Sequence, residues 1–138
     1  MEFVENKGQW NSRVDYRGDF NTGSFFIEKN GFTVLLHDPE DVQTLSEITH
    51  GHSSGKHNIT DSIIFNSFSY KVNLLGANKH AIPEPEKPLP TYNNYFIGND
   101  PDAWAGNCRV FQAVTYRDIY PNIDIRYYSS GNKLKYDF

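Results

Sequence analysis

The sequence of 138 residues has a single cysteine, Cys108, and no long apolar run. One cysteine excludes an internal disulfide bond and a zinc site built from several cysteines, and we expect a buried, unreactive thiol. A membrane-spanning helix needs ~20 apolar residues, so we expect no membrane insertion. The HExxH and glycine-rich phosphate-loop motifs are also missing. These absences favour a protein that is not an enzyme, and we expect no cofactor.

Positive charge is scarce as well. The sequence has 13 Lys and Arg against 17 Asp and Glu, a formal net charge of −4. Its basic residues are scattered, whereas a nucleic-acid backbone is bound by a concentrated basic surface. Nucleic acid is therefore not an expected partner.

Aromatic residues, in contrast, are abundant: 10 Phe, 9 Tyr and 2 Trp. Tyr and Phe favour half-buried sheet surfaces over helices, so the composition favours β structure. The length fits about one globular domain, because such domains most often have ~100–150 residues. We therefore expect residues 1–138 to form a single β-rich domain.

The clearest local signal is a pair of apolar runs over residues 24–36, joined by Asn30-Gly31. Because Asn-Gly tolerates positive φ at both central positions, this pattern predicts a β-hairpin with a type I′ turn. Asp38 and Pro39 follow as a helix cap and first helical residue, which predicts a short helix over residues 39–49. The glycine-, serine- and histidine-rich residues 49–58 then predict a long polar surface loop.

Further along, strict alternation predicts a strand over residues 67–75 with one face toward solvent. Four prolines within residues 82–90 predict an extended crossover strap outside the sheet interior, and Asp100-Pro101 predicts a single helical turn. The remaining patterns predict strands at 108–116, 123–129 and 133–138. Together these elements predict a mainly β, antiparallel sandwich-like fold with one short helix. Since the last strand pattern has no terminating turn, we expect the domain to be truncated there.

Two stretches of the sequence carry a resemblance to a known family. Residues 3–10 read FVENKGQW, and residues 92–104 read YNNYFIGNDPDAW, continued by YRDIYPNIDIRYY at 116–128 and LKYDF at 134–138. These stretches are similar to the FxENxGQ and NYFxGNDPxxW…VYPGIDxxYY…LEYDF motifs of a domain of unknown function. That domain lies near the N-terminus of large secreted Bacteroidetes-type proteins.

The resemblance implies a cellular setting rather than a reaction. Such domains follow a signal peptide and precede SBBP repeats, PKD- or Ig-like modules and a type IX sorting domain. The sequence start alone allows a cytosolic protein or a removed leader, and the resemblance favours a secreted or cell-surface protein whose leader is removed. Its expected partners are downstream domains of the same polypeptide. The family usually has glycine where Asn122 stands, and asparagine also tolerates left-handed geometry, so we expect the turn to be kept.

Two groups of residues are weak candidates for a metal site. His50, His52 and His57 carry imidazoles, but the glycines and serines between them favour a solvated loop. Asp100 and Asp102 offer oxygen ligands of the kind that calcium takes, although Asp100 is already explained as a helix cap. We therefore expect no metal at either place.

A set of aromatic and amide side chains is a candidate for binding sugar rings: Trp10, Tyr92, Tyr95, Asn99 and Trp104. Aromatic faces stack on sugars, but aromatics are also the main core fillers of a β domain, and the sequence leaves both roles open. Residues 61–63 resemble an O-glycosylation signal of exported Bacteroidetes proteins, with Ser62 as the acceptor. Our expectation is a structural or interaction module of a cell-surface protein, and the alternative is a polysaccharide-binding module of an exported adhesin or polysaccharide-degrading protein.

Overall fold

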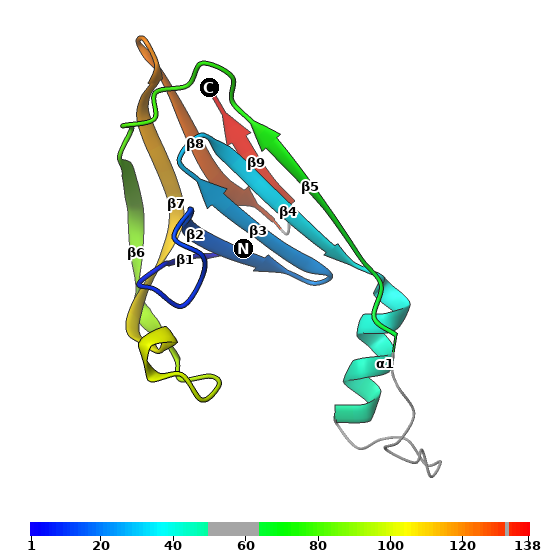
Figure 1. Ribbon diagram of the computed structural model, residues 1–138. Helices are drawn as coiled ribbons and strands as arrows, with labels where there is room; N and C mark the ends of the chain where they lie inside the picture. Colours follow the sequence, from blue (N-terminus) through cyan, green and yellow to red (C-terminus); the bar gives the residue numbers. More distant parts are fainter. Residues whose placement is uncertain (50–63, 132) are drawn as a thin grey trace.

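The computed structural model describes residues 1–49, 64–131 and 133–138 (Figure 1). Within these residues, nine strands form one antiparallel sheet, accompanied by one α-helix and one short 3-10 helix. The strands are β1 (Phe3–Glu5), β2 (Val14–Phe20), β3 (Gly23–Glu28), β4 (Gly31–His37), β5 (Ser67–Asn73), β6 (Pro83–Tyr95), β7 (Ala105–Tyr120), β8 (Ile123–Ser130) and β9 (Lys133–Asp137). The helices are α1 (Pro39–Thr49) and η1 (Pro101–Ala103).

Strand β7 is the point at which the sheet divides. The strand order is β5-β4-β3-β2-β1-β7-β8-β9, and β6 pairs with β7 as well. Along β7, Phe111 pairs with both Phe3 of β1 and Pro88 of β6, whereas Ala113 pairs with β6 and with β8. A strand has two edges. β6 pairs with one edge of β7, and β1 and β8 pair with successive segments of its other edge.

The two parts of the sheet, β1–β5 and β8–β9, curl toward each other from β7 (Figure 1). Tyr127 of β8 is 1% exposed, and its ring centroid lies 5.8 Å from that of Phe25 and 6.1 Å from that of Phe32. It also meets Tyr116 of β7 edge-on at 6.2 Å. The core is therefore aromatic and lies between the two parts. The expected mainly β, antiparallel fold with one short helix is confirmed, as one curled sheet rather than two separate sheets.

The predicted hairpin is confirmed as β3 and β4, but the predicted turn type is wrong. Glu28 pairs with Gly31, so the two turn residues are Lys29 and Asn30, and neither has the positive φ that a type I′ turn requires. The positive φ, +151°, falls on Gly31 instead. Position 31 needs glycine for a second reason, because an added Cβ would lie 1.9 Å from the carbonyl oxygen of Val72 in β5.

The predicted helix at 39–49 is confirmed as α1. The side chain of Asp38 accepts a hydrogen bond from the backbone N–H of Glu40 at 2.8 Å, and its carbonyl accepts from that of Val42, so Asp38 begins the helix. The helix stands away from the sheet beyond the end of β4 (Figure 1). Asp41 accepts two hydrogen bonds from Asn66, which joins the helix to the segment before β5.

The proline-rich strap predicted at 82–90 is wrong as a structural assignment, because residues 83–90 belong to strand β6. β6 pairs with β7 from Pro83↔Tyr116 to Tyr95↔Ala105, with register shifts after Pro88. It is an outer strand, paired only with β7 among the described residues. Outer strands tolerate proline because one of their edges has no ladder partner. The inference that this segment lies outside the sheet interior therefore holds, although it is a full strand.

The other predictions for the second half differ from the structure mainly in length. The strand predicted at 67–75 is β5, but the prediction that only one of its faces meets solvent is wrong, because Phe68 and Tyr70 are exposed and only Val72 is partly buried. The strand predicted at 108–116 is the longer β7, and those at 123–129 and 133–138 are β8 and β9. The predicted helical turn is η1. β1 and β2 have no counterpart among the predictions. The polar loop predicted at 49–58 lies almost entirely outside the described residues.

Candidate functional site

Two of the five candidate sugar-binding residues pack together. The rings of Trp10 and Tyr95 meet edge-on with centroids 5.2 Å apart, and both are partly buried against a small cluster that includes Cys108 and Val110. The guanidinium of Arg17 lies 5.4 Å from the centroid of the Trp10 ring. Trp10 and Tyr95 therefore serve chiefly in packing, with part of each ring left at the surface.

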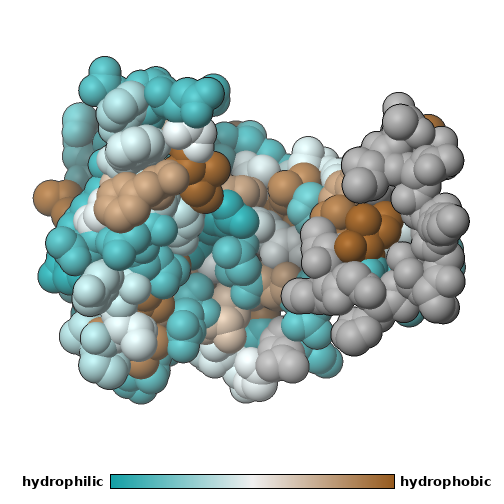
Figure 2. Space-filling view, turned by 90° about the horizontal axis from the view of Figure 1, so that it is seen from below, coloured by the Kyte–Doolittle hydropathy of each residue, from teal (hydrophilic) through white to brown (hydrophobic). Residues whose placement is uncertain are grey.

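The other aromatic candidates lie nearer the solvent, around the connection between β6 and β7. Trp104 is 43% exposed, meets Phe96 edge-on at 5.9 Å and donates its indole N–H to the carbonyl of Gly98 at 3.2 Å. Tyr92 pairs with Arg109 and is 58% exposed, and Asn99 is exposed. Figure 2 views the molecule from below and shows apolar atoms at the surface at this end. The candidates thus divide into a packed pair and an exposed group.

The candidate metal ligands Asp100 and Asp102 belong to a helix cap. The Asp100 side chain accepts a hydrogen bond from the backbone N–H of Asp102 at 3.1 Å, which begins η1. Residues 1–49, 64–131 and 133–138 contain no group of three or more His, Cys, Asp or Glu side chains placed to hold a metal ion. His50, His52 and the glycosylation candidate Ser62 lie outside the described residues.

An apolar groove lies between the two parts of the curled sheet and was not predicted from the sequence. Its volume is about 530 Å³, and side chains of β2–β5 and β9 line it. The apolar members of the lining are Met1, Phe20, Phe25, Phe32, Val34, Leu36, Tyr70, Val72, Leu134 and Tyr136. Alternation in β5 and β9 signals this surface, because Tyr70, Val72, Leu134 and Tyr136 occupy the apolar positions of those strands.

Asn6 organises the loop formed by residues 6–14. Its side-chain NH₂ donates to the carbonyls of Trp10, Asn11 and Val14, at 2.7 Å for Val14. Its side-chain oxygen accepts from the backbone N–H groups of Gly8 and Trp10. Gly8 has φ +114°, which favours glycine. The ENxGQ motif is therefore explained by loop structure.

A second motif, around residues 116–124, forms the turn between β7 and β8. The backbone N–H of Asp118 donates to the Asp124 side chain at 2.8 Å, and the N–H of Asn122 donates to the Asp118 side chain at 3.3 Å. Asp118 and Asn122 have φ values of +47° and +61°. The expectation that asparagine keeps the left-handed turn at position 122 is confirmed, and both carboxylates are used in holding backbone.

The carboxyl groups with shifted pKa values have structural partners. Burial is the largest single influence on the pKa of Glu5 and raises it. Hydrogen bonds from Arg109 and Lys7 together outweigh burial, so the pKa of Glu5 is lowered. Burial raises the pKa of Asp15, whose carboxylate accepts a hydrogen bond from the Tyr116 hydroxyl at 2.8 Å. Burial likewise raises the pKa of the Cys108 thiol, which is 0% exposed. An inert cysteine is consistent with this burial.

Glu86 has the clearest ionic role, since it joins three strands. The Arg126 guanidinium of β8 donates to both Glu86 oxygens, at 3.1 Å each, and the Thr115 hydroxyl of β7 donates to one of them. The hydrogen bonds from Arg126 are the main cause of a lowered Glu86 pKa. The ionised form of Glu86 therefore stabilises the β6-β7-β8 segment.

Replacing Glu86 by glutamine is expected to lower the free energy of unfolding by about 1 kcal/mol at pH 7, since the pair is partly exposed to solvent. A lowered pKa in the folded state stabilises the fold above the ordinary glutamate pKa of 4.5. This contribution is lost as pH falls through the lowered folded-state pKa. Urea unfolding of both proteins from pH 7 to pH 3 measures it, and a difference that persists unchanged at pH 3 would contradict the assignment.

Comparison with known proteins supports a family and no activity. Among the described residues, no helix is long and apolar enough to span a membrane. Neither a curated protein nor a solved structure matches the chain. A family model described as a domain of unknown function, DUF7948, matches residues 3–138. The match includes the Asn6 loop and the turn at 116–124, so the chain belongs to the DUF7948 family.

Proposed function

We propose that this domain is a non-catalytic interaction module that accepts an extended polypeptide strand between β5 and β9. The observation that carries the proposal is the apolar groove, which opens between the two ends of the curled sheet. β5 pairs only with β4 and β9 only with β8 among the described residues. Each strand thus has an edge with unpaired backbone groups, a ready template for another strand.

The side chains at these edges are apolar and exposed. Tyr70 of β5 is 45% exposed and Tyr136 of β9 is 47% exposed, and both line the groove. Phe68 and Phe138, each 64% exposed, extend the apolar surface along the same two segments. Contiguous apolar surfaces of this kind mark interaction sites in soluble proteins.

Charge indicates which strand fits. Lys133 and Lys135 are exposed and alternate along β9 with Leu134 and Tyr136. A strand added beside β9 places every second side chain on the groove side and the others beside the lysines. We therefore expect a segment in which apolar residues alternate with acidic ones.

The source of that segment follows from the motif resemblance. The motifs are similar to those of domains near the N-terminus of large secreted, cell-surface Bacteroidetes-type proteins. In such a polypeptide, a neighbouring domain is always at high effective concentration, which favours docking of even a weakly bound strand. The domain then acts as a structural module that fixes its neighbour on the cell surface.

The experiment is a calorimetric titration with the blocked peptide Glu-Val-Glu-Ile-Glu-Val-Glu. Wild type is expected to bind it, and Tyr70→Ala/Tyr136→Ala is expected to bind about tenfold more weakly. Two peptides serve as controls: Lys-Val-Lys-Ile-Lys-Val-Lys reverses the charge, and Glu-Val-Glu-Pro-Glu-Val-Glu removes a central backbone donor. Equal binding of all three peptides, or none of the first, would contradict the proposal. Trp104→Ala is the control variant, because it removes an exposed ring outside the groove.

Carbohydrate binding is a second candidate, favoured by the exposed ring pair of Phe96 and Trp104 near Asn99. Apolar ring faces at a loop, beside amide groups, suit sugar rings and their hydroxyls. Titration with soluble plant and bacterial polysaccharides tests this candidate, with Trp104→Ala expected to abolish binding and Tyr136→Ala to leave it unchanged. No binding by wild type at millimolar sugar would exclude it.

A further inference from the structure

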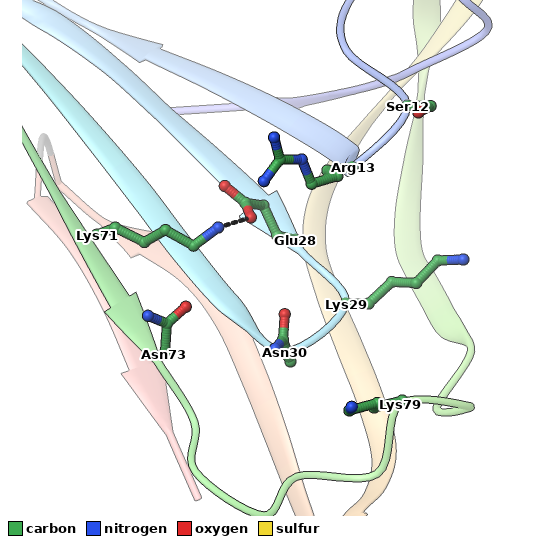
Figure 3. A pocket seen from close by; sticks show the side chains of 8 residues that line it. All are labelled: Ser12, Arg13, Glu28, Lys29, Asn30, Lys71, Asn73 and Lys79. Atoms are coloured by element: carbon green, nitrogen blue, oxygen red, sulfur yellow. Dashed lines mark hydrogen bonds and ion pairs between the residues drawn. The ribbon is translucent and has the colours of Figure 1, made fainter.

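Four basic side chains that are far apart in the sequence line one pocket of about 400 Å³. Arg13 comes from the β1–β2 connection, Lys29 from the β3–β4 turn, Lys71 from β5 and Lys79 from the β5–β6 connection. Figure 3 shows Arg13 and Lys71 on either side of Glu28 and Lys79 below Asn30, with the Lys29 side chain extending outward from the β3–β4 turn. The sheet topology therefore builds a local positive site on a protein with a formal net charge of −4.

The single carboxylate of the pocket is already neutralised. Glu28 forms an ion pair with Lys71, and its other oxygen accepts a hydrogen bond from the Thr33 hydroxyl at 2.7 Å. The ion pairs among the described residues involve neither Arg13 nor Lys29 nor Lys79. Lys29 lies close enough to Asp15 to lower the pKa of its carboxyl group, but the Asp15 carboxylate accepts a hydrogen bond from the Tyr116 hydroxyl. The four basic side chains and one carboxylate that line the pocket therefore have a formal net charge of +3.

The backbone around these cations is held in place. The Asn11 side chain accepts from the N–H of Arg13 at 3.0 Å, within the loop that Asn6 organises. Beside Lys79, the backbone N–H of Asn78 donates to the carbonyl of Ile119 in β7 at 2.8 Å. Lys29 belongs to a two-residue turn. A ligand therefore meets an arrangement whose backbone is largely preformed, which reduces the entropy cost of binding.

Neutral donors complete the lining: Ser12, Asn30 and Asn73. Side-chain amides and hydroxyls form hydrogen bonds with hydroxyl groups as well as with anions. A volume of about 400 Å³ falls within the ~300–1,000 Å³ typical of small-molecule sites. Three unpaired cations with three neutral donors fit a hydroxyl-rich anion better than a bare inorganic ion.

We propose that this pocket binds an acidic saccharide through its carboxylate or sulfate groups. Arg13 and Lys79 bind the anionic groups, and Asn30, Asn73 and Ser12 bind neighbouring hydroxyls. The site is separate from the groove, because Lys71 alternates along β5 with Tyr70 and Val72 and so lies on the opposite face of the strand. The pocket and the groove can therefore be tested, and can fail, independently.

The test is calorimetric titration with trigalacturonate, a sulfated galactose trisaccharide, neutral maltotriose and inorganic sulfate. We expect one or both acidic trisaccharides to bind, binding to weaken as NaCl rises, and maltotriose to give no signal. Arg13→Gln/Lys79→Gln is expected to weaken binding about tenfold, since both charge-assisted contacts are lost. If trigalacturonate alone binds, the ligand is a uronate, and if the sulfated sugar alone binds, it is a sulfated saccharide.

Lys133→Gln/Lys135→Gln is the matched control, because it removes the same charge from exposed positions on β9. Its affinity should remain within about twofold of wild type, and thermal melts of both double variants establish that they fold. The proposal is overturned if the control loses as much affinity as Arg13→Gln/Lys79→Gln. It is also overturned if inorganic sulfate alone binds, or if maltotriose binds as well as the acidic sugars.

Discussion

Replacing Tyr127 by alanine is expected to lower the free energy of unfolding by about 3–5 kcal/mol, the range for removing a large aromatic side chain from a core. Tyr127 is the ring through which β8 contacts the other part of the curled sheet. It packs against Phe25 and Phe32 of the β1–β5 part, against Tyr116 of β7 and against Tyr136 of β9. A cavity at this position removes the ring contacts by which β8 packs against the β1–β5 part of the sheet.

Chemical denaturation at pH 7 measures the effect, with Tyr127→Phe as the control. Burial raises the pKa of the Tyr127 hydroxyl, so the neutral phenol is the form in the core and phenylalanine keeps its ring contacts. Tyr127→Phe is expected to lose less than about 1.5 kcal/mol. An alanine variant as stable as the phenylalanine variant would show that the two parts of the sheet are held together elsewhere.

Replacing Gly31 by alanine is expected to detach the end of β5 from β4 and to lower the free energy of unfolding by at least about 3 kcal/mol. The new Cβ would lie 1.9 Å from the Val72 carbonyl oxygen, which no side-chain rotation relieves. Its φ of +151° adds strain for any residue with a Cβ, typically of order 1–3 kcal/mol. Moving β5 away from this collision also displaces Lys71 and Asn73, which line the basic pocket. The variant is therefore expected to bind the acidic saccharide more weakly as well as to be less stable.

Gly131→Ala is the control variant that distinguishes the cost of a positive φ from the cost of a steric clash. Gly131 has φ +61°, and an added Cβ there would meet no atom within 4 Å. Its cost is therefore expected to be only about 1 kcal/mol, from conformation alone. Equal losses for the two variants in urea unfolding would contradict the proposed contact between position 31 and β5.

The strands and helix that the sequence predicts correctly are those with local signals. Asn30-Gly31 between two apolar runs marks the β3–β4 hairpin, and Asp38-Pro39 marks the start of α1. The turn type was wrong because the pairing of Glu28 with Gly31 moves the two-residue loop to Lys29 and Asn30. Register depends on neighbouring strands, which a local dipeptide does not encode.

Long-range pairing explains the remaining differences. The prolines of residues 82–90 disfavour a sheet interior, but only the position of β6 at the outer edge of β7 shows that they form a strand. β1 has three residues and is held by β2 and β7 on either side. A segment so short has no periodicity to detect, so it was missed.

The basic pocket could not be predicted from local sequence. Arg13, Lys29, Lys71 and Lys79 are isolated in the sequence and looked scattered, yet β-sheet pairing gathers them. Some residues of the family motifs serve local geometry: Asn6 holds a loop, and Asp118 and Asp124 hold a turn. Others are candidate binding residues, because Leu134 and Tyr136 of the LKYDF motif line the groove. Arg13 and Lys79 of the basic pocket lie outside the motifs.

The most direct test of the central proposal is amide hydrogen exchange with and without the peptide Glu-Val-Glu-Ile-Glu-Val-Glu. A strand docked between β5 and β9 should slow exchange of the edge amides of β9 by at least about tenfold, because they gain ladder hydrogen bonds. Amides of β6, the outer strand on the other side of β7, serve as the internal control and should not change. Slower exchange confined to β9 and β5 is the predicted result. Unchanged exchange in β9 under saturating peptide, or equal slowing in β6, would contradict the proposed role of this domain.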